Sequence, residues 1–136
     1  MDFLKSMAIA AAGLRSQAGR MRVISENLAN AESTSPDAGG DPYRRRIPTF
    51  RNELDAAVGT RVVGLGPVAT DPSDFRSKYE PGHPSADASG MVKYPNVNTM
   101  VEMTDMREAQ RSYDANLNVV TATRRMVQRT LDILRG

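Results

Sequence analysis

The 136-residue chain has no cysteine, no tryptophan and a single histidine. The absence of cysteine excludes disulfides and thiolate metal sites. Only 5% of the residues are aromatic, so no large aromatic cluster anchors a compact centre. His83 lies in a Pro-Gly-His-Pro turn, without a second histidine that could share a metal ion. We therefore predict that the chain has no metal site and no cofactor.

Catalytic motifs are missing as well. The segment Gly64-Leu65-Gly66-Pro67 lacks the third glycine of the dinucleotide-binding fingerprint. The chain contains neither a phosphate-binding lysine loop nor a Gly-x-Ser-x-Gly motif. Asp71 and Asp74 are separated by Pro72, which makes this stretch a turn and not a metal cage. We predict that the protein is not an enzyme and takes no small-molecule substrate.

Long apolar runs are absent too. No stretch approaches the roughly 20 apolar residues of a membrane-spanning helix. The first residues, Met1-Asp2-Phe3-Leu4-Lys5, lack the basic region and apolar core of a secretory signal peptide. If the protein leaves the cytosol, we expect a route that leaves this N-terminus in place.

The chain also lacks a strong charge of one sign. The formal net charge is only +2, and Arg44–Arg46 is the one dense basic run. Nucleic-acid modules usually carry a wider basic face, so we predict no nucleic-acid partner. A helical DNA-binding or membrane-surface protein that uses Arg44–Arg46 and the N-terminal helix remains the alternative.

What the chain does have is an apolar stripe with heptad spacing near each end. The first comprises Leu4, Met7, Ala11, Leu14, Ala18, Met21, Ser25 and Leu28. The second comprises Met103, Met106, Gln110, Tyr113, Leu117, Val120, Arg124, Val127, Leu131 and Leu134. An average step of 3.5 residues is typical of helices that wind around other helices. We predict that the apolar members pack between helices or subunits, with Gln110 and Arg124 either setting register or marking where the stripe turns outward.

Between the stripes, proline and glycine punctuate the chain. We predict a helix over 3–31 with Asp2 as its cap, and a second helix over 100–134 that starts at a Thr99-x-x-Glu102 capping box. Strand-like pieces occur at 43–50, 60–65 and 91–94. The predicted fold is therefore mainly α with a small β-rich insert, and the two helices form a coiled-coil-like pair. The corresponding parts are 1–31, 32–98 and 99–136.

The second helix is apolar on more than one side. Val119, Met126 and Ile133 form a further apolar set beside the heptad stripe. A helix that is apolar over more than one stripe usually contacts more than one neighbour. The pattern favours assembly of several subunits over the alternative, a simple two-helix hairpin covered by the insert.

Several local motifs resemble one protein family. Asn27-Leu28-Ala29-Asn30 is similar to a signature near the N-terminus of bacterial flagellar rod and hook proteins, and Pro42-Tyr43-Arg44-Arg45-Arg46 narrows the resemblance to the proximal rod. The more specific matches are Tyr79–Pro84 and Gly90–Asn98, and Glu108–Asn116 resembles the family's C-terminal helix motif. These motifs extend over essentially the whole chain in the family's order.

The resemblance implies a structural subunit whose terminal helices pack into a helical tube, the basal-body rod that transmits torque from motor to hook. It implies that the partners are other copies of the chain, other rod proteins, and the membrane-embedded ring and adaptor at the rod base. It also implies export by the flagellar type III apparatus without cleavage, and a place in the rod that crosses the periplasm.

Overall fold

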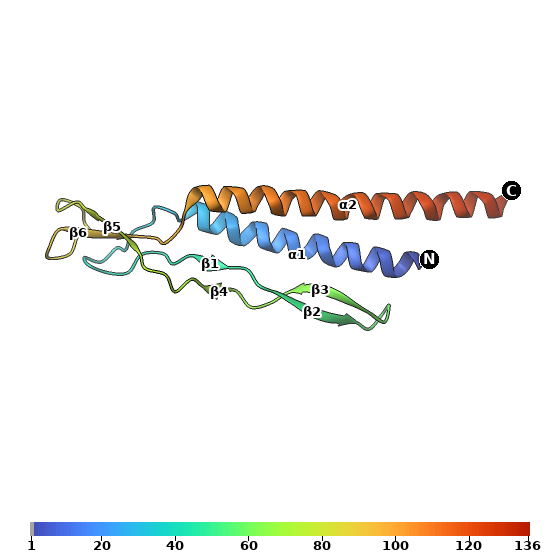
Figure 1. Ribbon diagram of the computed structural model, residues 1–136, viewed down its shortest axis with the longest axis horizontal. Helices are drawn as coiled ribbons and strands as arrows, with labels where there is room; N and C mark the ends of the chain where they lie inside the picture. Colours follow the sequence, from blue (N-terminus) through green and yellow to red (C-terminus); the bar gives the residue numbers. More distant parts are fainter. Residues whose placement is uncertain (1) are drawn as a thin grey trace. The chain divides into compact units, whose positions relative to one another are not determined.

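The computed structural model describes residues 2–136 and contains two long helices and, between them in the sequence, three small antiparallel sheets (Figure 1). Helix α1 spans Phe3–Ala29 and helix α2 spans Thr99–Arg135. The sheets pair β1 (Arg46–Ile47) with β4 (Ala69–Thr70), β2 (Phe50–Asp55) with β3 (Thr60–Leu65), and β5 (Arg76–Tyr79) with β6 (Met91–Tyr94). The prediction of a mainly α fold with a small β-rich insert is confirmed.

Helix α1 begins where the sequence predicts and ends slightly earlier. The Lys5 N–H donates to Asp2 Oδ1 at 3.1 Å, so Asp2 satisfies one of the backbone donors left free at a helix start. The last helical residue is Ala29, two residues before the predicted end at residue 31. There the Asn30 side-chain amide donates to the Glu26 carbonyl oxygen at 2.9 Å. The backbone N–H of Asn30 donates to the same carbonyl at 3.1 Å, so the side chain adds a second donor to the last hydrogen bond of the helix.

The start of α2 differs from the predicted capping box. Asn98 Oδ1 accepts from the N–H groups of Met100, at 3.1 Å, and Val101, at 3.4 Å. Asn98 is therefore the cap, and Thr99 is already the first helical residue. The Glu102 carboxylate does not return to the helix start, because it bonds to Asn27 and Arg45 instead. The capping-box prediction is wrong for that reason.

The strands at 60–65 and 91–94 are confirmed with their predicted bounds. The predicted strand at 43–50 is wrong in extent, since only Arg46–Ile47 pairs there and residue 50 opens the next strand. Strand β2 was missed because its sequence, Phe-Arg-Asn-Glu-Leu-Asp, is mostly polar and four of its six side chains are exposed. Gly59, at φ 62°, supplies the left-handed residue of the β2–β3 turn.

The chain folds into two compact units. The first unit combines the chain up to Met21 with Thr49–Pro67 and Arg107–Gly136; the second combines Arg22–Pro48 with Val68–Met106. Each helix thus contributes to both units. Within the first unit, α2 and the β2–β3 hairpin lie on different sides of α1 (Figure 1).

The two units have differently built cores. In the first unit the most deeply buried residues are small or short: Ala10, Ala12, Ser16, Ala109 and Thr123, with Val62 from the hairpin. In the second unit larger apolar side chains are buried: Val23, Ile24, Val92, Tyr94 and Val97. The second unit also buries Asn27 and Glu102 almost completely. Because buried polar groups need partners, these two residues mark the place where specific hydrogen bonds hold that unit together.

Candidate assembly interface

Asn27 is the centre of a buried polar cluster in the second unit. Its Nδ2 donates to the Arg46 carbonyl oxygen at 2.8 Å, and its Oδ1 accepts from the Arg46 N–H at 2.9 Å. The Tyr43 hydroxyl also donates to Asn27 Oδ1, at 2.8 Å, and Asn27 Nδ2 lies 3.3 Å from Glu102 Oε2. The side chain of Asn27 is fully buried. One amide therefore joins the end of α1, the chain before β1 and the first turn of α2.

Arg45 connects the same cluster to the turn that follows β4. Its Nε donates to Glu102 Oε1, and its Nη1 lies 3.3 Å from Asp71 Oδ2. A third carboxylate, that of Asp105, lies 3.9 Å from Nη2. The side chain of Glu102 is 1% exposed and that of Arg45 is 21% exposed. A buried pair of this kind contributes to a unique arrangement more than to net stability, because desolvation offsets much of the attraction.

Two more side chains hold the turn at 71–73. Arg44 Nη1 donates to the carbonyl oxygens of Asp71, at 2.9 Å, and Ser73, at 3.0 Å. The Asn96 side-chain amide donates to the same two carbonyls, each at 3.1 Å. Asn96 Oδ1 in turn accepts from the Arg45 N–H at 2.8 Å. The turn is therefore fixed from two sides, by the chain before β1 and by the chain before α2.

The ionisation of this cluster follows from these contacts. Burial alone lowers the pKa of Arg45, but hydrogen bonds and charge from Glu102 and Asp71 outweigh it, and the net pKa is raised. Hydrogen bonds from Ser73, together with Arg45, lower the pKa of Asp71. Burial raises the pKa of Tyr43, with the charge of Arg46 acting in the opposite direction. At neutral pH, Asp71 and Arg45 are ionised and the Tyr43 hydroxyl keeps the proton that it donates to Asn27.

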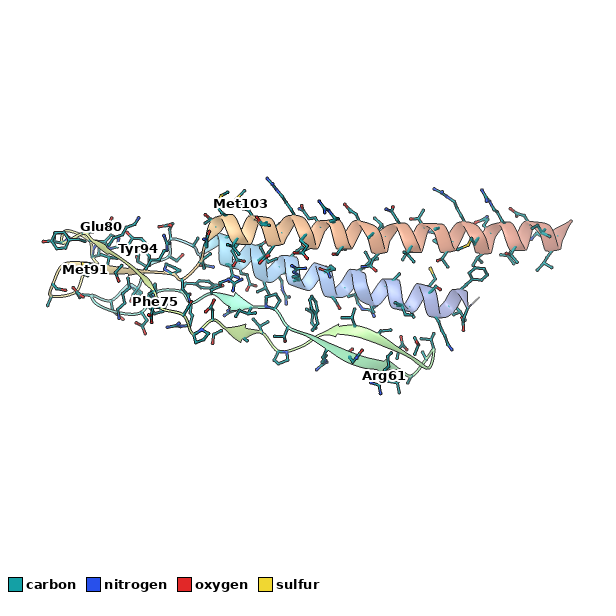
Figure 2. The ribbon with its side chains drawn as sticks, in the orientation of Figure 1. Arg61, Phe75, Glu80, Met91, Tyr94 and Met103 are labelled. Carbon is teal, nitrogen blue, oxygen red and sulfur yellow. The ribbon has the colours of Figure 1, made fainter. Side chains whose placement is uncertain are left out.

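The β5–β6 sheet carries a smaller polar set (Figure 2). The Tyr94 hydroxyl donates to Glu80 Oε2 at 2.7 Å, which raises the pKa of Tyr94. Lys78 and Arg76 lie near the Tyr94 ring, with centroid distances of 4.8 Å and 5.9 Å. His83 Nδ1 accepts from the Ser85 N–H at 3.0 Å, so His83 serves as a turn acceptor. These contacts stabilise the lobe, and none of them assembles a nucleophile with a base.

Across residues 2–136, no three His, Cys, Asp or Glu side chains are placed to share a metal ion. Neither helix described here combines the length and the apolar character that a membrane crossing requires.

In the first unit, the helices approach at residues without bulk. A Cβ added to Gly13 would lie 2.7 Å from Asn116 Oδ1, and one added to Gly19 would overlap Leu65 Cδ1. Because Gly13 has no side chain, α2 can pack close to α1 there, and Gly19 allows the same close packing of the hairpin. The Ser16 hydroxyl donates to the Val63 carbonyl oxygen at 3.2 Å, and Arg20 Nη2 lies 3.6 Å from Glu108 Oε2. Close packing and a few polar contacts hold α1 between its two neighbours.

The buried side of α2 contains small and polar residues at seven-residue intervals. Glu102, Ala109 and Thr123 are buried, and Asn116 is partly buried. Each lies one position before a residue of the predicted stripe: Met103, Gln110, Arg124 and Leu117, respectively, all of which are exposed. The interior therefore uses the positions that approach α1 most closely. The bulkier neighbours remain at the surface.

The predicted packing residues accordingly fall into two groups. Partly buried are Met7, Leu14, Met21, Leu28, Met106, Tyr113, Val120 and Val127. Exposed in the single chain are Leu4, Met103, Leu117, Leu131 and Leu134. Figure 2 shows Met103 on the exposed side of α2. Of the Asn-Leu-Ala-Asn motif, Asn27 belongs to the buried cluster and Asn30 ends α1, whereas Leu28 is half-buried and Ala29 exposed.

The exposed apolar residues concentrate on the later part of α2, in the first unit. They are Leu117, Val119, Met126, Leu131, Ile133 and Leu134, with Ile133 and Leu134 nearly four-fifths exposed. A groove of about 560 Å³ lies along Leu117, Val120 and three arginines, and another of about 310 Å³ lies between Leu4, Met7 and Leu131. On the hairpin, Phe50, Leu54 and Val63 are also exposed. Exposed apolar surface that gathers in this way is typical of interaction sites.

The sequence did not point to the polar residues that connect distant segments of the chain. Asn96, Asn116 and the Arg45–Glu102 pair were not singled out, because a lone polar residue gives no periodic signal. One signal was available: the interval of seven residues that links Glu102, Ala109, Asn116 and Thr123. The interval is only visible when small and polar residues are counted as members of a packing stripe.

The C-terminal third of the chain matches a known protein family. Residues 88–133 match the family described as the C-terminal part of flagellar basal body rod FlgEFG proteins. This segment includes β6 and nearly all of α2.

Relatives of full length resemble the chain from end to end. The chain is 52% identical to the flagellar basal-body rod protein FlgC of Agrobacterium fabrum, over 100% of this chain and 99% of that protein. It is 40% identical to FlgC of Salmonella typhimurium, over 98% of each chain. It is 32% identical to FlgC of Bacillus subtilis, over 98% of this chain and 99% of that protein.

Proposed function

This chain belongs to the FlgC family of flagellar basal-body rod proteins, the structural subunits of the rod, and from that premise we propose how it assembles. Its two long helices act as a coiled-coil-like pair in a helical tube, and their outer surfaces contact neighbouring subunits. One observation carries the proposal: the apolar residues on the later part of α2 are exposed in the single chain.

The energetics favour covering that surface. Full burial of a Leu, Ile or Met side chain is worth about 1.5–3 kcal/mol, so Ile133 and Leu134, which are 79% and 78% exposed, lose much of this in an isolated subunit. A helical assembly repeats a contact between two unlike surfaces. The exposed side of α2 is one such surface, and it requires a different surface on the neighbouring subunit.

Family membership supports the choice of partners. We assign the covering surfaces to other copies of this chain and to other rod proteins, with the membrane-embedded ring and its adaptor as neighbours at the rod base. In this proposal the chain reaches the periplasm through the flagellar type III export apparatus without cleavage, and the assembled rod transmits torque from motor to hook.

A DNA-binding or membrane-surface protein is not supported. The basic run that suggested it is engaged inside the second unit: Arg44 holds two carbonyls of the turn at 71–73, Arg45 bonds to Glu102, and Arg46 lies 3.4 Å from Glu26. Three arginines bound to their own chain leave this run little basic surface for phosphate groups.

Leu117→Asp tests the proposal. Leu117 is 44% exposed, so the purified variant should keep its stability within about 0.5 kcal/mol. In cells carrying it as the sole copy, we expect synthesis of the protein but no rods in purified basal bodies, and no motility. Asn118→Asp adds the same charge to the next, also exposed, residue and should assemble. Normal rods with Leu117→Asp would contradict the assignment of this surface.

A further inference from the structure

The two units carry opposite net charge. The first unit contains eleven Lys and Arg against six Asp and Glu, a net charge of +5. The second contains seven Lys and Arg against ten Asp and Glu, a net charge of −3. The net charge of the whole chain is only +2 because the opposite net charges of the two units largely cancel. Fields of opposite sign on two parts of one molecule attract the unlike parts of two molecules.

The positive charge of the first unit is concentrated beside the apolar surface of α2. Arg124, Arg125 and Arg129 line the groove of about 560 Å³ together with Leu117 and Val120. Within residues 2–136, none of these three arginines has a carboxylate within 4.0 Å. Arg125 and Arg129 are four residues apart on α2, where like charges repel. The groove thus combines an apolar floor with cations that gain from an external acid.

The second unit presents the complementary charge. Five of its seven cations are held by its own chain, namely Arg44, Arg45, Arg46, Arg76 and Lys93. In contrast, the carboxylates of Asp37 and Asp74, both exposed residues, accept no hydrogen bond and form no ion pair within the described part of the chain. The charge left for external contacts is therefore negative.

We propose that the arginine-lined groove of one copy docks on the acidic second unit of another copy, through carboxylates that include Asp37 and Asp74. The inference rests on the proposed assembly and gives it a direction. Like units repel and unlike units attract, so the contact is between different surfaces and can repeat along a polymer. A polyanion such as DNA or an acidic lipid surface fits less well, because the second unit would be repelled from it.

Charge reversal tests this inference in the full-length chain. Arg125→Glu with Arg129→Glu should weaken self-association, measured by sedimentation at low salt, by at least tenfold. The matched control is Arg107→Glu with Arg111→Glu, which makes the same change at exposed positions of α2 outside the groove and should have a much smaller effect. Adding Asp37→Lys and Asp74→Lys to the groove variant should restore association.

A chain without cysteine also permits direct mapping. Arg125→Cys in one copy and Asp74→Cys in another should form a disulfide on mixing under oxidising conditions, whereas Arg111→Cys should not. No loss on charge reversal, or no restoration by the acid-to-lysine changes, overturns the inference. Binding to duplex DNA or to phosphatidylglycerol vesicles that the groove variant abolishes, without loss of self-association, also overturns it. If Leu117→Asp blocks rods while the groove variant assembles normally, only the charge inference fails, and the proposed function stands.

Discussion

The side-chain amide of Asn27 and the peptide groups of Arg46 exchange two hydrogen bonds, at 2.8 Å and 2.9 Å. Paired strands exchange bonds in the same way, so the end of α1 holds the insert as a strand would. The same amide makes two further hydrogen bonds: its oxygen accepts from the Tyr43 hydroxyl, and its nitrogen donates to Glu102. Because Asn27 is fully buried, its side chain makes all of these bonds within the protein.

Asn27→Ala should therefore be strongly destabilising. It removes the partner of the Arg46 N–H and carbonyl, of the Tyr43 hydroxyl and of Glu102, which is itself 1% exposed, and an unsatisfied buried polar group costs about 1–3 kcal/mol. We expect the free energy of unfolding to fall by about 2–4 kcal/mol, measured in urea by tyrosine fluorescence, since the chain has no tryptophan. Asn30→Ala, which removes two local and part-buried bonds, to the Glu26 carbonyl and from the Ser33 hydroxyl, should cost about 1 kcal/mol. Equal losses for both variants would contradict the role of Asn27.

The Arg45–Glu102 pair predicts a different response to single and double substitution. Glu102→Ala leaves Arg45 partly buried beside a void, and breaking a buried pair from one side costs about 3–5 kcal/mol. Replacing both partners, as Arg45→Met with Glu102→Leu, should recover most of that loss. Glu26→Ala is the control: it removes the carboxylate paired with Arg46, which is far more exposed than Glu102. It should change stability by at most about 1 kcal/mol. A double variant as unstable as Glu102→Ala would show that the pair itself is needed.

Gly13 and Asn116 should be energetically coupled. Gly13→Ala favours the helix by about 1 kcal/mol but places a methyl group 2.7 Å from Asn116 Oδ1. Asn116→Ala removes that conflict, so the double variant should be more stable than the sum of the single effects predicts, by about 0.5–3 kcal/mol. Thermal unfolding of the four proteins measures the coupling. Additive effects would mean that the helices do not approach at this point.

Acid should destabilise the turn at 71–73. The pKa of Asp71 is lowered in the folded chain, so its contribution is fully present above the ordinary Asp pKa of about 3.9. That contribution is lost as the pH falls through the folded pKa, because the unfolded chain then binds the proton more readily. Asp71→Asn should flatten the fall of stability below about pH 4, as followed by urea titrations at several pH values. Asp74→Asn, on an exposed residue that accepts no hydrogen bond within residues 2–136, is the control; an unchanged slope in Asp71→Asn would rule out this account.

The helices were predictable because their determinants are local. Asp2 caps α1 as expected, and α2 runs from residue 99 to residue 135 without a proline or glycine to interrupt it. The capping of α2 was not predictable in the same way. Asn98, Thr99 and Glu102 are all suitable for a helix start, and only the position of Arg45 and Asn27 decides that Glu102 is used elsewhere.

Only part of the candidate interface could be predicted from the sequence. A heptad stripe identifies which side of α2 is apolar, and Val120 and Val127 are partly buried on it. It does not distinguish packing within one subunit from packing between subunits. That distinction follows from Gly13, which brings α1 so close that Asn116 faces it while Leu117 stays outside.

By itself, the sequence determined two long helices, a β-containing insert, the lack of cysteine thiols, and a resemblance to flagellar rod proteins. These properties depend on composition and on spacings of a few residues. The tertiary structure alone decided which polar groups meet. Asn27 reaches Arg46 and Glu102 across 19 and 75 residues of chain, and such contacts depend on the path of the whole backbone, which no local pattern encodes.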